Sequence, residues 1–323
     1  MRANMIRSLT QRWNVDTAIV LVALGCVALL AMGSSVSSNF LTADYLLQQL
    51  QIAAYLGVIA AGATLVIFLG HIDLSVPAAL TAVGVVATTV AGVENPDVAA
   101  LGIAAGLAAG ALIGLINGIG VAIFRLPSMV WTLAVNSMLV GAVVFFTGGF
   151  KPRGVAPELS IDLALGRSLG VPNAFWFWCV VIVLMHVLLR RTVYGQYIMA
   201  AGNSEKAVYL SGIRVRLLTM LTFVLAGLFT AVGSLLLVGY ANQAYQGMGD
   251  PYLMPVLSAV VLGGTSILGG QGSYSGTVVG ALFITLLTSI LSVLQMPEAV
   301  RQITFGLIIL GMLLLRRGKA KGQ

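Results

Sequence analysis

Residues 98 to 124 read VAALGIAAGLAAGALIGLINGIGVAIF, a run of 27 residues without a charged side chain. A helix needs about 20 predominantly apolar residues to cross the hydrocarbon core of a membrane. An uncharged run of this length is typical of a transmembrane helix, whereas buried helices of soluble domains are shorter or carry a polar face. The stretch therefore predicts a helix that spans a membrane.

The composition of the whole chain supports the same conclusion. The 323 residues are 59% apolar and 8% charged, with 17 basic and 10 acidic side chains, where a soluble protein of this length carries about 80 charged residues in all. The chain has too little polar surface to cover a water-soluble globule. We predict an all-α polytopic membrane protein that forms one transmembrane domain over residues 1–323.

Apolar runs recur along the chain and indicate about ten crossings, with an error of one or two. The ten runs are 17–32, 45–69, 74–93, 98–124, 127–147, 174–189, 217–240, 252–268, 277–294 and 299–315. The breaks near His71 and at residues 269–272 leave two forms open, a full loop or a re-entrant turn. Several helices span the membrane in either case.

The formal charge of +7 is a topology signal and does not indicate a nucleic-acid partner. With the amino terminus inside and ten crossings, 13 of the 17 basic residues fall on inner loops and tails. They are Arg2, Arg7, Arg12, Arg125, Arg190, Arg191, Lys206, Arg214, Arg216, Arg316, Arg317, Lys319 and Lys321. Cytoplasmic loops carry an excess of Lys and Arg, so both termini are predicted to be cytoplasmic.

Two loops are longer than a helical hairpin needs. The outer loop, 148–173, contains Pro152, Pro157 and Pro172, and it is either a docking surface for a soluble periplasmic partner or an ordinary surface loop. The inner loop, 190–216, is polar and basic. Its length suits two short helices broken at Gly202 and Gly212, as a cytoplasmic docking element would need.

Glycine recurs at every fourth position of the run 98–124. The series is Gly102, Gly106, Gly110, Gly114 and Gly118. Residues at this spacing share one face of a helix, and glycine lets a second backbone approach closely. The face is predicted to pack tightly against another helix, either statically or as a surface along which helices slide.

Polar residues inside the apolar runs are candidates for a translocation path. Asn117 lies beside the glycine face, and Thr132 and Asn136 lie in the next run. They would be costly facing lipid, so they should face the protein interior or a hydrated path. A polar pathway and plain hydrogen bonds between helices both remain open.

His71 and Asp73 lie between the second and third apolar runs. Two such side chains are too few ligands for a metal site, and none is predicted. A helix amino terminus capped by Asp73 or Ser75, with Pro77 in the first turn, explains them more simply. Asp73 also joins the candidate path, because it is the only carboxylate that an ion-coupled transporter could use within the membrane.

The stretch GGTSILGGQGS at residues 263–273 resembles a phosphate-binding loop but lacks its lysine. The chain contains no GxxxxGK followed by Ser or Thr, no HExxH and no Ser-His-Asp arrangement of the known orders. We therefore expect no catalytic residue, no nucleotide site and no cofactor bound by this chain.

Five ordered blocks resemble the permease subunits of bacterial ABC importers for ribose, xylose, arabinose and related monosaccharides. They are GHIDLSVPAAL at 70–80, GLINGIGVAIFRLPSMVWTLAVNSM at 114–138, RRTVYGQYIMAAGNSEKAVYLSGI at 190–213, VVLGGTSILGGQGSYSGTVVGAL at 260–282, and the closing apolar run. The chain departs from the family at His71, where a second glycine is common, and at Gln196, where Arg or Lys is common. Both departures leave the substrate open.

The resemblance implies a subunit of about ten helices in the bacterial inner membrane. It implies a second permease copy or a sister subunit, two ATPase subunits that hold ATP and Mg²⁺, and a periplasmic sugar-binding protein. It also implies that the inner loop couples to the ATPase. The residues carried over are Gly202, Asn203, Glu205, Lys206, Ala207, Leu210, Ser211, Gly212 and Ile213.

Three other functions remain as alternatives to monosaccharide import. Two are ABC permeases of the same superfamily, for nucleosides or for branched-chain amino acids. The third is an ion-coupled secondary transporter, which would need carboxylates within the membrane.

Overall fold

The computed structural model describes residues 2–92, 96–149 and 154–320, with side chains for residues 19–37, 39–92, 99–149 and 154–314. The described chain is mostly helical. The long helices are α1 Arg2–Val36, α2 Ala43–Phe68, α3 Val76–Ala91, α4 Pro96–Ala122, α5 Ser128–Thr147, α7 Asn173–Arg191, α10 Val215–Ala241, α12 Tyr274–Val293 and α13 Glu298–Ala320. The shorter elements are η1 Ser38–Leu41, α6 Glu158–Leu165, β1 Arg167–Ser168, β2 Val171–Pro172, α8 Val193–Asn203, α9 Glu205–Leu210, η2 Asp250–Tyr252 and α11 Leu253–Leu262.

Seven described helices are long and apolar enough to cross a membrane. They are residues 19–36 of α1, α2, residues 99–122 of α4, α5, α7, α10 and α12. Each of the ten predicted apolar runs falls on a helix of the structure. The prediction of a helical multi-pass membrane protein is confirmed, while the number of crossings stays a prediction.

Two features correct the sequence-based expectations. The run 252–268 is not one helix, because α11 ends at Leu262 after ten residues and spans only about 15 Å. A second, unexpected feature is a small antiparallel hairpin of β1 and β2 after α6, with Arg167 opposite Pro172, which leaves the all-α class unchanged. Pro152 of the same loop lies outside the described residues.

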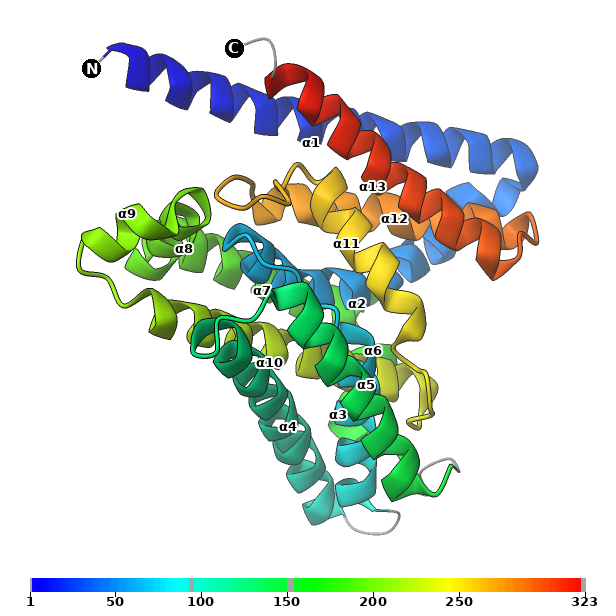
Figure 1. Cartoon of the computed structure of the whole chain (residues 1–323). Helices are drawn as coiled ribbons and strands as arrows, with labels where there is room; N and C mark the ends of the chain where they lie inside the picture. Colours follow the sequence, from blue (N-terminus) through cyan, green and yellow to red (C-terminus); the bar gives the residue numbers. More distant parts are fainter. Residues whose placement is uncertain (1, 93–95, 150–153, 321–323) are drawn as a thin grey trace.

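The centre of the molecule is α2, which is buried from Ala53 to Phe68. Figure 1 shows α2 between the part of the molecule that contains α11 to α13 and the part that contains α3 to α5. The most extensive helix pair is α4 with α10, and α10 also packs against α2 and α3. On the other side of α2, α12 packs against α1, α2 and α11.

The glycine face of α4 is where α3 and α10 come closest to it. A Cβ atom added at Gly102 would lie 2.6 Å from the Ala87 carbonyl oxygen of α3. One added at Gly110 would lie 2.6 Å from the Gly227 carbonyl oxygen of α10. Gly114 faces the Phe223 carbonyl oxygen more closely still, and Gly106 and Gly118 contact side-chain and backbone atoms along the same line. Backbone therefore packs on backbone along this face, as glycine permits.

The side chains that carried most of the charge-based topology argument lie outside the described part of the chain. They are those of Arg2, Arg7, Arg12, Lys151, Arg153, Arg316, Arg317, Lys319 and Lys321. The orientation of the two termini therefore stays a prediction. The geometry defines two ends without reference to a membrane: one carries α8 and α9, and the other carries η1, α6 and the hairpin (Figure 1).

Candidate translocation and coupling site

Four predicted path residues, Asp73, Asn117, Thr132 and Asn136, converge on the connection between α2 and α3. This connection, residues 69–75, leaves α2 through Gly70 at φ +83°, a backbone conformation that glycine adopts without strain. Asp73 belongs to the connection itself. Asn117 of α4 and Thr132 of α5 reach it through hydrogen bonds, and Asn136 of α5 bonds the first turn of α3 directly after it.

Asp73 organises the start of α3. Its Oδ1 accepts hydrogen bonds from the backbone N–H of Ser75 at 2.8 Å and from the Ser75 hydroxyl at 2.6 Å. The Nδ2 group of Asn117 donates to the Ser75 hydroxyl at 2.7 Å and lies 3.4 Å from Asp73 Oδ2. Ser75 is the N-cap residue, and Pro77 lies in the first turn as expected, but the Ser75 side chain makes no cap hydrogen bond. The side-chain cap expected for α3 is therefore replaced by a turn through the Asp73 carboxylate.

Side chains of α5 accept the backbone donors on the other side of the same connection. The N–H of Leu74 donates to Thr132 Oγ1 at 2.9 Å, and the N–H of Ala78 donates to Asn136 Oδ1 at 3.2 Å. The N–H of Ile72 donates to the Ser128 hydroxyl at 3.3 Å. The first N–H groups of a helix have no partner within it, so Asn136 satisfies such a donor at Ala78, while Ser128 and Thr132 satisfy donors of the loop before the helix.

Asn117, Thr132 and Asn136 therefore form hydrogen bonds between helices in this conformation. Ser128, which joins them, was not singled out from the sequence. Its signal was its place directly after Pro127, at the start of a predicted helix.

The charges around the connection are few and partly buried. Burial raises the pKa of Asp73, and hydrogen bonds from Ser75 and Asn117 oppose this rise. Burial lowers the pKa of His71, and the nearby Glu205 carboxylate opposes that shift. Asn117 Oδ1 is buried without a hydrogen-bond donor among the described residues. Among these residues, no three His, Cys, Asp or Glu side chains lie close enough to hold a metal ion.

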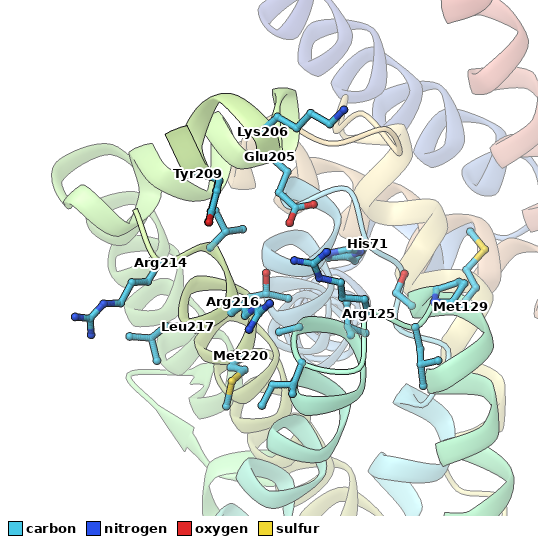
Figure 2. A pocket seen from close by; sticks show the side chains of 18 of the residues that line it. His71, Arg125, Met129, Glu205, Lys206, Tyr209, Arg214, Arg216, Leu217 and Met220 are labelled. Carbon is cyan, nitrogen blue, oxygen red and sulfur yellow. The ribbon is translucent and has the colours of Figure 1, made fainter. Parts of the chain in front are cut away.

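A cavity of about 1300 Å³ opens beside the connection at the α8–α9 end. Its walls come from His71, the ends of α4 and α5 around Arg125, and the segment from Glu205 to Met220. Figure 2 shows Glu205 and Tyr209 pointing from α9 into the cavity, toward His71 and Arg125, while Arg214 points away. Lys206, Arg125, Arg214 and Arg216 form no ion pair with any described carboxylate.

The segment 190–216 contains two short helices, as expected, but the break between them differs from the prediction. It falls at Ser204, whose hydroxyl accepts a hydrogen bond from the Ala207 N–H and caps α9. Gly202 lies in the last turn of α8, while Gly212, at φ +82°, ends the α9 turn. The predicted coupling residues Glu205, Lys206, Ala207, Leu210, Ser211 and Gly212 are exposed, and Ile213 is half-buried.

Gly202 joins α8 to the core through close backbone packing and Asn203 through its side-chain amide. We call this contact the backbone junction (Phe68, Gly202, Asn203, Gly269 and Gly270). The Gly270 N–H donates to the Phe68 carbonyl oxygen at 2.9 Å, and Asn203 Nδ2 donates to the Gly270 carbonyl oxygen at 3.0 Å. A Cβ atom on Gly202 would collide with the Phe68 carbonyl oxygen. The end of α2, the end of α8 and the loop between α11 and α12 therefore meet at one point.

These features define a class of protein. The described chain is a bundle of apolar helices whose polar side chains converge inside the bundle beside a cavity. An exposed pair of short helices, α8 and α9, is attached to the core at the point where α2 ends. Such an arrangement is that of a multi-pass transport protein.

Comparison with known proteins gives the family. Residues 45–313 match the model of the family described as "Branched-chain amino acid transport system / permease component". The chain belongs to this family of permease components. It is therefore a transport subunit and not a catalytic enzyme.

Three relatives show how far the similarity extends. The chain is 34% identical to the ribose import permease protein of Escherichia coli (strain K12) over 308 residues, 94% of each chain. It is 33% identical to the L-arabinose ABC transporter permease protein of Azospirillum brasilense over 299 residues, 91% of this chain and 85% of that one. It is 30% identical to the autoinducer 2 import system permease protein of Salmonella paratyphi B over 302 residues, 93% of this chain and 85% of that one. No solved structure matches the chain.

Proposed function

We propose that this chain is the membrane subunit of an ABC importer that carries a monosaccharide of the ribose, xylose, arabinose or galactose class across the bacterial inner membrane. The observation that carries the proposal is similarity to permeases named for ribose and L-arabinose along more than nine tenths of the chain. The family description names branched-chain amino acids, so the substrate needs a direct test.

The proposed arrangement has about ten crossings, with both termini in the cytoplasm and one transmembrane domain over residues 1–323. It counts α3, α13 and the broken segment 252–268 with the seven long helices. Because α11 alone covers about 15 Å, this last crossing would be completed by the non-helical residues after Leu262. Residues 190–216 form the cytoplasmic coupling loop, and residues 148–173 form a periplasmic loop. The excess of basic residues on the inner loops supports this orientation.

The proposed partners are two ATPase subunits, a second permease copy or a sister subunit, a periplasmic sugar-binding protein and the surrounding lipid. ATP and Mg²⁺ belong to the ATPase subunits, and this chain holds no cofactor and no nucleic acid. The exposed helix α9, with Tyr209 70% and Leu210 83% exposed, offers the ATPase an apolar surface rimmed by basic side chains. Exposed apolar side chains next to charge are typical of a protein–protein contact.

The mechanism follows from linkage between two conformations. ATP binding moves α9, and the backbone junction carries that displacement to the end of α2 and to the α2–α3 connection. The connection is attached through Asp73 to Asn117 of α4 and through its N–H groups to Thr132 of α5 and, at the start of α3, to Asn136. The shift between conformations can be no larger than the difference in their affinity for ATP.

The test is purification of this chain from native membranes in mild detergent, with identification of the accompanying chains. ATP hydrolysis is then measured with the matching binding protein and with D-ribose, L-arabinose, D-xylose or L-leucine. The proposal predicts that one sugar-loaded binding protein stimulates ATP hydrolysis. Stimulation by L-leucine alone would replace the sugar with an amino acid. Uptake in cells that survives ATP depletion but stops with an uncoupler would refute ATP-driven import.

A further inference from the structure

A second cavity, of about 510 Å³, lies at the opposite end of α2 from the coupling helices. Its lining includes Asp44, Gln48 and Gln51 of the first turns of α2, whereas His71, after the other end of α2, lines the first cavity. The 26 residues of α2 cover about 39 Å, which exceeds the hydrocarbon thickness of a bilayer. The second cavity therefore opens on the membrane face opposite to the coupling helices.

Most residues that line this cavity are polar, while Tyr45, Ile52 and Leu165 add apolar surface to it. Asp44, Gln48 and Gln51 lie at spacings of four and three residues, so they share one face of α2. Arg167 of the hairpin and Tyr240 of α10 close the cavity from the other side. Uncharged apolar side chains would suit a face in contact with lipid, so this face must serve water or a polar ligand.

Several hydrogen-bonding groups in the cavity have no partner among the described residues. The side-chain amides of Asn39 and Gln48 and the hydroxyl of Tyr240 make no hydrogen bond with the described residues, although the Tyr240 ring packs on Tyr55. Gln51 donates through Nε2 to Tyr55 and to the Ala164 carbonyl oxygen, which fixes its amide plane and leaves Oε1 as a free acceptor.

The charged groups at the rim balance one another. Arg167 Nη1 lies 3.7 Å from Asp44 Oδ1, and both side chains are at least half exposed. A free anion or cation would have to displace one member of this pair. A neutral ligand with many hydroxyl groups would use both, because a hydroxyl donates to carboxylate and accepts from guanidinium.

We infer that this cavity is a binding site for a neutral polyhydroxylated solute at the outer mouth of the permease. The fixed amide of Gln51, the unpartnered amides of Asn39 and Gln48, a carboxylate–guanidinium pair and the half-exposed ring of Tyr240 present donors, acceptors and an apolar ring surface. They do so within a volume typical of small-ligand sites. The inference rests on the proposed function for the identity of the solute, a monosaccharide released from the binding protein.

The site is tested by saturation-transfer NMR on the purified permease with D-ribose and L-arabinose. Tetrahydropyran, a ring of similar size without hydroxyl groups, is the negative probe. Gln48→Leu removes one free amide without breaking any contact within the described chain, and we expect it to weaken sugar binding by about three- to tenfold. Gln243→Leu is the matched control, since Gln243 is also exposed at this end but does not line the cavity.

Transfer to the sugars that is weakened by Gln48→Leu and unchanged by Gln243→Leu would support the site. Absence of saturation transfer from the wild-type permease to the sugars, or equal transfer from both variants, would overturn it even if cells accumulate the sugar. A further outcome is that the binding protein fails to stimulate ATP hydrolysis in the Gln48→Leu importer while saturation transfer to the sugars is unchanged. That result would overturn the sugar site and identify the cavity as a docking surface for the binding protein. If the purified permease binds sugar but cells that contain it import only an amino acid, the site stands and the proposed function is refuted.

Discussion

Asp73 shows how one side chain serves both the local backbone and the contact between helices. Its carboxylate holds the start of α3 through Ser75 and faces α4 through Asn117. Buried groups of this kind are costly when one partner is removed, because the remaining donors lose both water and their acceptor.

The first prediction separates the acceptor from the charge of Asp73. Asp73→Asn keeps an oxygen acceptor for Ser75 and should retain most uptake, whereas Asp73→Ala leaves two donors unpaired and should cost about 1–3 kcal/mol of stability. Thermal unfolding and sugar uptake of both variants are the measurements. Complete loss of uptake in well-folded Asp73→Asn would point instead to an ion-coupling carboxylate.

The second prediction concerns pH. The folded pKa of Asp73 is raised by burial, so the folded state holds the proton more tightly than the unfolded state. Its contribution to stability is therefore fully present below the unfolded pKa and is lost as the pH rises through the folded pKa. From about pH 4 upward, the wild type should lose stability relative to Asp73→Asn, as read from paired unfolding curves. Parallel curves across this range would contradict the assignment.

Individual polar residues were predictable from the sequence, but their partners were not. Asn117, Thr132 and Asn136 are conspicuous because a polar group facing lipid is costly. That all three meet residues 73–78 depends on how α4 and α5 cross α3, which one sequence does not determine. For the same reason the sequence left open whether Asp73 or Ser75 caps α3: the Ser75 hydroxyl makes no cap hydrogen bond and accepts from Asn117, while Asp73 accepts from the Ser75 N–H.

At the scale of elements, glycine determines how closely helices approach. The third prediction is that Gly110→Leu separates α4 from α10, because even a Cβ atom would lie 2.5 Å from the Cβ atom of Ala231. Overpacking of this kind costs about 1–3 kcal/mol or more. Thermal stability of the purified permease measures it, with Gly141→Leu as control, since a Cβ atom at Gly141 would meet no atom within 4 Å. Equal stability of the two variants would refute tight packing.

The fourth prediction concerns the backbone junction. Gly202→Ala would drive a methyl group into the Phe68 carbonyl oxygen, so α8 must shift from the end of α2. In the assembled importer we expect ATP hydrolysis to persist, while the number of sugar molecules transported per ATP hydrolysed falls about fivefold or more. A fall of this size corresponds to the loss of a modest coupling free energy between the two sites. Gly141→Ala is the matched control. Unchanged transport per ATP would show that the displacement travels by another route.

The sequence predicted the positions of the helices better than their lengths. Hydrophobicity located every long helix, since a lipid-facing segment must satisfy its backbone internally. It failed at residues 252–268, where Gly263 and Gly264 end α11 although the composition stays apolar. The glycine pair was the available signal for that break. The β1–β2 hairpin has no recognisable apolar pattern in the sequence, because each of its strands is only two residues long.

At the scale of the whole molecule, the two ends of α2 should face opposite sides of the membrane. The fifth prediction replaces Cys26 and Cys179, the free cysteines among the described residues, by Ala and then introduces Leu169→Cys or Ser211→Cys. Leu169 lies at the hairpin and is 95% exposed, while Ser211 follows α9. An impermeant maleimide should label the first variant from outside intact cells and the second only in inverted vesicles. Labelling of both from one side would refute the proposed topology.

The backbone junction also bears on how such a permease can change during evolution. Its central hydrogen bond joins main-chain atoms of Phe68 and Gly270, so replacing the Phe68 side chain leaves both atoms in place. A side chain at Gly202 or Gly270 would collide with this junction, whereas replacing Gln48 at the far end of α2 breaks no hydrogen bond among the described residues. A permease could therefore evolve to carry a new solute through substitutions at that end of α2, while the backbone junction that links it to the ATPase subunits stays the same.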